Sequence, residues 1–213
     1  MRSLAVALLA ACGGTGPKKV LADYLAAEQS GRYEDAHALL ATSDRAARSL
    51  DAYAAEHLGA GPVWLAVART TRFEIGEPTA AEPGVRISVL AAHADVAAVA
   101  RELPPPPADR LAETDDALSF SVRWYEGELG KRAVPEVAET VVYALVEESP
   151  GWRVWLGLDR QDAAVALLRR AEDAERRGDA PAARAAWDAL LALPEDPAGV
   201  VAALKADARR RPR

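Results

Sequence analysis

Residues 139–158 read ETVVYALVEESPGWRVWLGL, and this stretch decides the fold class. Val142, Ala144 and Val146 alternate along the chain with Val141, Tyr143 and Leu145, which is typical of a β-strand with one buried face. The turn residues Ser149-Pro150-Gly151 separate this strand from a second one over Trp152–Leu158. The pattern therefore predicts an antiparallel hairpin.

Other alternating segments predict further strands of the same sheet. Residues 69–75 and 85–89 alternate and are rich in β-branched side chains, with a loop over Gly76–Gly84 between them. Ala117–Glu126 also alternates, with Leu118, Phe120, Val122 and Trp124 on one side, so we expect a strand there. Asp95–Leu103 predicts a short helix. The four prolines at 104–107 begin a linker that runs to residue 116.

Helical periodicity precedes and follows these strands. Residues 18–41 predict a helical hairpin that turns at Ser30-Gly31, and a third helix starts near Leu50. From Asp162 onward the chain is helical, with breaks at Gly178-Asp179 and at Pro194. The expected fold class is α+β: three N-terminal helices packed on a curved antiparallel sheet, followed by a C-terminal helical hairpin.

Composition restricts the partners of this chain. It has 213 residues, 50% of them hydrophobic and 27% charged, with a formal net charge of −6. Such a chain can bury a real core, but its acidic balance makes it a poor nucleic-acid binder, so no nucleic-acid partner is expected. The single cysteine, Cys12, excludes an intramolecular disulfide.

The amino terminus has the three parts of a secretory signal. Arg2 is followed by an uncharged apolar run over 4–11 and then by Cys12. Leu9-Ala10-Ala11-Cys12 resembles the lipobox of bacterial lipoproteins. The resemblance implies a signal peptide over 1–11, lipidation of Cys12, and a flexible tether over 12–17. The alternative is a cytosolic protein with an incidental apolar start.

Three segments, in this order, resemble the nuclear transport factor 2-like superfamily, which has a cone-shaped, cystatin-like α+β fold. They are Tyr24–Ala36 (YLAAEQSGRYEDA), Leu40–Arg45 leading to Leu50–Tyr53, and Val146–Val154 (VEESPGWRV). The resemblance covers residues 18–158 and implies a cavity between sheet and helices. The segment 95–116 departs from the family pattern and leaves the strand order open. Some members are isomerase- or hydratase-like enzymes and many only bind, so the fold by itself implies no reaction.

The tail over 159–213 resembles a single tetratricopeptide-like unit with a basic end. Ala171, Gly178, Ala183 and Trp187 lie at the spacings of that motif. One unit cannot bury its own face, so we expect the tail to dock on the main domain or, through 160–208, on an envelope protein partner.

Few residues suggest chemistry in the cavity. The candidate ligand-binding residues are Tyr24, Tyr53, Trp124, Tyr143 and Trp152, and an enzyme could also use Asp44 or Glu139 as its acid–base carboxylate. The three histidines are too far apart in sequence to suggest a metal site, and no cofactor or catalytic set is expected.

These observations predict a membrane-anchored, extracytoplasmic binding or structural protein. In a bacterium with two membranes, Gly13 after Cys12 favours the periplasmic face of the outer membrane. The alternatives are a lipid-anchored enzyme that uses the cavity and an interaction module of an envelope assembly.

Overall fold

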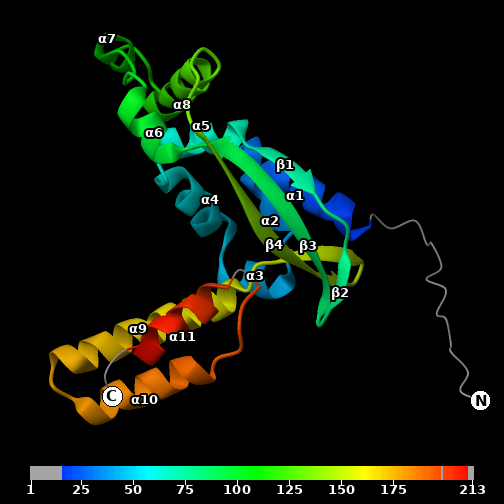
Figure 1. The fold of residues 1–213 in the computed structure, drawn as a ribbon, viewed down its shortest axis with the longest axis vertical. Coiled ribbons are helices and arrows are strands. Elements are labelled where there is room, and N and C mark those ends of the chain that lie inside the picture. The colour runs from blue at the N-terminus through cyan, green and yellow to red at the C-terminus, as the bar shows by residue number, and fades with distance from the viewer. Residues whose placement is uncertain (1–15, 198, 211–213) are drawn as a thin grey trace, which may run out of the picture.

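The computed structural model describes residues 16–197 and 199–210. Within these residues the chain is α+β, with eleven helices and an antiparallel sheet of five strands. Figure 1 shows an elongated molecule: the sheet and the N-terminal helices lie in the middle, one helical group lies at one end, and the C-terminal helices lie at the other. The predicted signal peptide, Cys12 and most of the tether lie outside the described residues.

Five helices precede the first strand, where three were expected. They are α1 (Pro17–Gln29), α2 (Tyr33–Ala38), α3 (Thr42–Ala47), α4 (Leu50–Gly59) and α5 (Pro62–Thr70). Pro17 and Pro62 lie in the first turns of α1 and α5, where the missing N–H costs no hydrogen bond. Ser49 caps α4 by accepting a hydrogen bond from the Ala52 amide. The sequence of α5 contains valine and threonine, which have a low helix propensity. It is helical because it packs on a later helix of the chain, and local propensity does not include such tertiary contacts.

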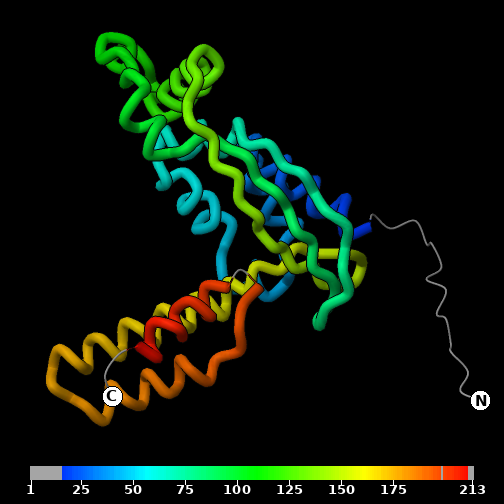
Figure 2. The backbone as a smooth tube through the Cα atoms, in the orientation of Figure 1, coloured from blue at the N-terminus to red at the C-terminus, as the bar shows by residue number. Residues whose placement is uncertain are grey.

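The sheet has the strand order β1-β3-β4-β5, and β2 pairs with β3 beside β1. Its strands are β1 (Arg72–Ile75), β2 (Thr79–Ala81), β3 (Gly84–Ala94), β4 (Glu136–Glu148) and β5 (Gly151–Trp155). The predicted hairpin is confirmed as β4 and β5, while β2 lies in the segment expected to be a loop. The long strands β3 and β4 pair antiparallel from Val85↔Leu145 to Ala94↔Glu136 and run side by side in Figure 2.

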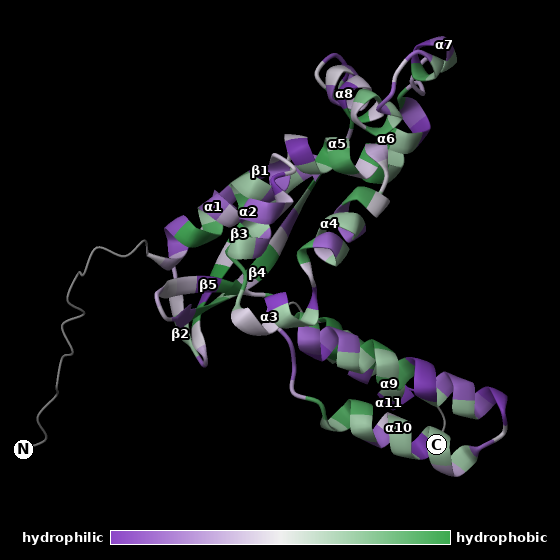
Figure 3. Cartoon of the chain, turned by 180° about the vertical axis from the view of Figure 1, so that it is seen from behind, coloured by the Kyte–Doolittle hydropathy of each residue, from purple (hydrophilic) through white to green (hydrophobic). Residues whose placement is uncertain are grey.

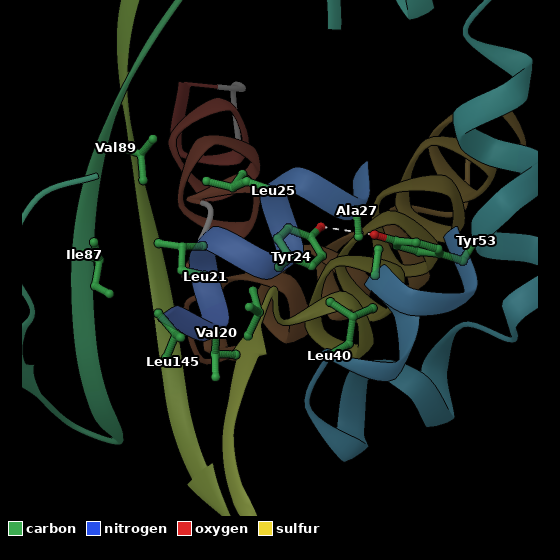
Figure 4. Packing of buried hydrophobic residues seen from close by; sticks show 12 residues of the cluster. Val20, Leu21, Tyr24, Leu25, Ala27, Leu40, Tyr53, Ile87, Val89 and Leu145 are labelled. Carbon is green, nitrogen blue, oxygen red and sulfur yellow. Dashed lines mark hydrogen bonds between the residues drawn. The ribbon is translucent and has the colours of Figure 1, made fainter. Parts of the chain in front are cut away.

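The main core lies between α1, α2 and one face of the sheet. Ile87, Val89 and Leu145 are fully buried on that face, and α1 contributes Leu21 and Leu25 (Figure 4). Burial of each such side chain contributes about 1.5–3 kcal/mol, so this contact is the main attachment of the helices to the sheet.

The chain between β3 and β4 forms helices, and the strand predicted over Ala117–Glu126 is wrong. Its helices are α6 (Val96–Glu102), α7 (Ala108–Ala112) and α8 (Ala117–Leu129); α6 was expected, and α7 lies in the expected linker. The apolar residues of the α8 sequence fit both the two-residue period of a strand and the 3.6-residue period of a helix. Val122 and Tyr125 recur at helical spacing and are buried with Leu65 and Val67 of α5 in a second core. Asp116 caps α8 by accepting from the Ser119 amide at 2.9 Å.

The C-terminal tail contains the predicted helical hairpin, α9 (Leu158–Arg176) and α10 (Ala180–Ala192), followed by a third helix, α11 (Val200–Arg210). They enclose a third core in which Ala164, Leu190 and Val201 are fully buried. Figure 3 shows hydrophobic and hydrophilic residues mixed along α9 and α10, as expected for helices that each bury one face.

Asp44 of α3 joins the tail to the rest of the molecule. Its side chain is fully buried and accepts hydrogen bonds from the backbone amides of Leu156, at 2.6 Å, and Leu158, at 2.7 Å. Burial raises the pKa of Asp44, against the lowering effect of these two hydrogen bonds. Arg48 adds an ion pair to Asp162 of α9 at 2.6 Å. The tail therefore docks on α3, and Asp44 holds the start of α9.

Candidate functional site

A cavity of about 440 Å³ lies between α1, α4, α5 and the inner face of the sheet. Its apolar wall includes Leu25, Leu65, Phe73 and Val141. Trp64 also lines it and is 48% exposed, which is high for a tryptophan and places the ring where the cavity meets solvent. The volume lies within the range of small-molecule sites, so the cavity is large enough to hold a ligand.

A hydrogen-bonded network joins three residues of the cavity wall, Tyr24, Glu28 and His57, to Tyr53 behind them. The Tyr53 hydroxyl donates to Glu28 Oε1, and the hydroxyls of Tyr24 and Tyr53 lie 3.1 Å apart. Since the single proton of the Tyr53 hydroxyl is given to Glu28, Tyr24 must be the donor in the tyrosine pair. Figure 4 shows this pair, with Tyr24 on α1 facing Tyr53 on α4. The network therefore links two helices through side chains alone.

His57 completes the network as a cation. Its Nδ1 lies 2.8 Å from the Tyr53 carbonyl oxygen and its Nε2 lies 2.7 Å from Glu28 Oε2. Both partners accept, so both ring nitrogens carry protons. Burial lowers the pKa of His57, but the hydrogen bonds to Glu28 and to the Tyr53 backbone outweigh it, and the pKa is raised above 6.5.

The tyrosines of the cavity resist ionisation. Burial, followed by the charge of Glu28, raises the pKa of Tyr24 well above its usual value, and burial does the same for Tyr53. Burial and the charges of Glu28 and Glu139 raise the pKa of Tyr143 to about 12. These hydroxyls therefore stay neutral at physiological pH, as hydrogen-bonding groups rather than bases.

A second polar region lies at the sheet side of the cavity. His93 of β3 and Glu139 of β4 both line it, with His93 Nε2 3.6 Å from Glu139 Oε1. His93 Nδ1 lies 2.9 Å from the Ala94 carbonyl oxygen and donates to it, which turns Nε2 toward the carboxylate. Arg69 of α5 lines the cavity as well and pairs with Glu126 of α8 at 3.5 Å.

The structure brings together only part of the set of ligand-binding residues expected from the sequence. Tyr24 and Tyr143 line the cavity with their rings in edge contact, 6.4 Å between centroids, and Tyr53 supports them from behind at 2% exposure. Trp124 and Trp152 do not line it, which corrects the expectation for both. Trp124 is on α8, where its indole N–H donates to the Pro104 carbonyl at 3.0 Å, and Trp152 packs on the main core.

Of the two carboxylates considered for an enzyme, Glu139 lines the cavity, whereas Asp44 serves α9 instead. Glu28 and His57 were missed. A signal for them exists in the sequence, because His57 follows Tyr53 by one helical turn and Glu28 follows Tyr24 by one.

Two further observations concern the described residues only. Within 16–197 and 199–210, no group of three or more His, Cys, Asp or Glu side chains could hold a metal ion. No helix in the same part of the chain is both long and apolar enough to cross a membrane.

Protein-family models, curated proteins and solved structures were all compared with this chain, and none matches it. The geometry of the cavity is therefore the basis for a functional proposal.

Proposed function

We propose that this chain is a lipid-anchored, non-enzymatic protein of the bacterial cell envelope whose cavity binds a small, largely apolar ligand. One observation carries the binding role. The cavity has apolar walls, and its Tyr–Glu–His network is bonded to itself rather than presented to a ligand. Such a site offers shape and apolar surface, with a few fixed polar groups for orientation.

The second candidate is an enzyme of the isomerase or hydratase type, which the convergence of tyrosines and a carboxylate favours. A general base needs a free lone pair within reach of the substrate proton. Glu139 lines the cavity and has a lone pair free, so a base is present. The hydroxyl protons of Tyr24 and Tyr53 are already donated, to Tyr53 and to Glu28, so neither tyrosine is free to donate to an oxyanion. Binding without turnover is therefore the better-supported role.

The finer fold assignment is also a proposal. Residues 18–158 fit a nuclear transport factor 2-like cone, because helices α1, α2 and α4 pack against the inner face of the sheet and leave a cavity open. The helices α6–α8 are then an insertion between β3 and β4.

The anchor is proposed from Leu9-Ala10-Ala11-Cys12. Mass spectrometry of the membrane-fraction protein should find an amino terminus at Cys12 that carries acyl chains, and Cys12→Ala should abolish both the modification and the membrane attachment. A full-length chain retaining Met1 and a free thiol would contradict the anchor. It would leave the cavity argument intact.

The ligand-binding role is tested with N-phenyl-1-naphthylamine, a neutral apolar probe whose fluorescence rises when it leaves water. We expect saturable binding with one site per chain. Ala91→Leu adds three carbon atoms inside the cavity and should weaken binding about tenfold, equivalent to about 1.4 kcal/mol. Ala92→Leu is the matched control, because residue 92 follows on the same strand and faces the opposite side of the sheet.

A second filling variant, Ala68→Leu, places the extra carbons on α5 instead of the sheet. Together the two filling variants separate occupation of the cavity from damage to one element. Absence of saturable binding, or equal binding by the filling variants and the Ala92→Leu control, would exclude the proposed role.

A protein partner bound through 160–208 is a further proposal. It is supported by the position of α9–α11, which extend away from the sheet and contact the rest of the chain mainly where the start of α9 meets α3 (Figure 1). Pulldown from envelope extracts with the full chain and with a chain lacking 160–208 tests it, and equal recovery of the same protein by both would exclude it.

A further inference from the structure

Three residues form a row across the inner face of the sheet. Ala91 of β3 pairs with Phe73 of β1 on one side and with Glu139 of β4 on the other, and all three line the cavity. Neighbouring strands lie about 4.8 Å apart, so the backbones of Phe73 and Glu139 are about 10 Å apart with only a methyl group between them. The row therefore leaves a gap between an aromatic ring and a carboxylate.

Glu139 is the carboxylate of this cavity whose charge is least neutralised. Glu28 is paired with the His57 cation at 2.7 Å, and Glu56 is paired with Arg48. Among the described residues Glu139 has no Arg or Lys partner, and its ion-pair contact is His93 at 3.6 Å. Its side chain is 60% exposed, so it can reorient toward a ligand.

The remaining cation of the cavity, Arg69, does not cancel this charge. It belongs to α5 and is directed to Glu126 of α8 at 3.5 Å. The lining holds three carboxylates, Glu28, Glu56 and Glu139, against the cations His57 and Arg69, so its charge balance is negative. An anionic ligand would meet repulsion here.

Aromatic rings surround the same space. Tyr24, Tyr33, Trp64, Phe73 and Tyr143 line the cavity from five different elements. The face of each ring carries partial negative charge and attracts cations, and this attraction grows when the cation leaves water. The rings and the carboxylate thus favour the same sign of ligand charge.

We propose that the ligand is an organic cation, an aryl- or alkylammonium compound. Its positive group lies over Ala91, between the Phe73 ring and the Glu139 carboxylate, and its apolar part lies along Leu25, Leu65 and Val141. This inference rests on the proposed ligand-binding role and adds the class of ligand to it.

The test compares three probes that differ only in the charged group: 2-naphthylmethyl-trimethylammonium, its neutral carbon isostere 2-neopentylnaphthalene, and the anion 2-naphthylacetate. Isothermal titration calorimetry with the full chain carrying Cys12→Ala gives each Kd at 0.15 M salt. We expect the cation to bind about tenfold tighter than the neutral isostere, and the anion to bind weakest. In Glu139→Gln the preference for the cation should fall to about threefold, while the neutral probe binds as before.

Glu147→Gln is the matched control, because Glu147 is an exposed carboxylate of the same strand that does not line the cavity. It should keep the tenfold preference. Equal binding of the cation and its neutral isostere, or tightest binding of the anion, overturns the ligand class while leaving the ligand-binding role in place, because the neutral probe still binds. A cation preference that Glu139→Gln leaves unchanged also overturns the inference, since the charge would then be recognised elsewhere.

Discussion

Tyr53→Phe tests the network that links α1 to α4. The change removes one oxygen atom from a side chain that is 2% exposed and leaves its ring in place. That oxygen donates to the Glu28 carboxylate and accepts from Tyr24, whose hydroxyl lies 3.1 Å away. A hydrogen bond to a charged group contributes about 1.5–3 kcal/mol and a neutral one about 0.5–1.5 kcal/mol. The free energy of unfolding should therefore fall by about 2–4 kcal/mol.

The assay is urea unfolding at pH 6, followed by near-ultraviolet circular dichroism. With a denaturant slope of about 2 kcal/mol per molar, the expected loss moves the midpoint down by about 1–2 M. Tyr33→Phe is the control, because no described residue hydrogen-bonds to the Tyr33 hydroxyl and its ring also contacts His57, at 5.0 Å between centroids. The control should change stability by less than about 0.5 kcal/mol.

A double-mutant cycle separates the two bonds. Tyr24→Phe and Tyr53→Phe both break the tyrosine pair, so the double variant should cost about 0.5–1.5 kcal/mol less than the sum of the single variants. Additive effects would mean that the two hydroxyls are not bonded. A Tyr53→Phe protein as stable as the Tyr33→Phe control would refute the network itself.

Four further predictions concern other parts of the molecule. Asp44→Ala leaves two buried amides without an acceptor and should lower the free energy of unfolding in urea by about 2–4 kcal/mol, with faster hydrogen exchange at the start of α9. Unchanged exchange there would contradict the role of Asp44 in holding α9. Because the pKa of His57 is raised in the folded state, its contribution to stability is complete below pH 6.5 and is lost as pH rises through the raised value. His57→Gln should flatten that part of the curve of stability against pH. A curve like that of the wild type would contradict the protonated state of His57 in the folded protein. Trp124→Phe removes the bond to the Pro104 carbonyl and should cost about 1 kcal/mol without changing probe binding; weaker probe binding would show that the indole reaches the cavity. Leu190→Ala should cost about 2–5 kcal/mol, seen by hydrogen exchange in α9–α11, and leave probe binding intact; loss of binding would show that tail and cavity are coupled.

The apolar run over 141–146, closed by the turn residues Ser149-Pro150-Gly151, located the β4–β5 hairpin, and β4 buries Leu145 on one face and Ala144 on the other. Period-two alternation failed at Ala117–Glu126, where Leu118 and Val122 satisfy a spacing of two and a spacing of four at once. Only the packing of α8 on α5 decides between strand and helix there. Local pattern is sufficient where one period is present, and tertiary contact decides where two compete.

The cavity could be predicted only in part. Tyr24 and Tyr143 were expected because amphipathic aromatic side chains on elements that face each other meet at a core boundary. Glu28 and His57 were not, since helical spacing relates each of them only to a tyrosine of its own helix, whereas their ion pair joins α1 to α4. Trp124 was misplaced because it was assigned to a strand, and on α8 its indole faces the proline segment instead.

The helical segment between β3 and β4 has a consequence for how the cavity keeps its shape. Its helix α8 packs on α5, and α5 supplies Trp64, Leu65 and Arg69 to the cavity wall. Replacing residues 95–135 with a short turn would preserve the pairing of β3 with β4. It would also expose the side of α5 that packs on α8, so the cavity wall formed by α5 would lose its support. Substitutions in α6–α8 can therefore change the width of the cavity, although none of its lining residues belongs to those helices.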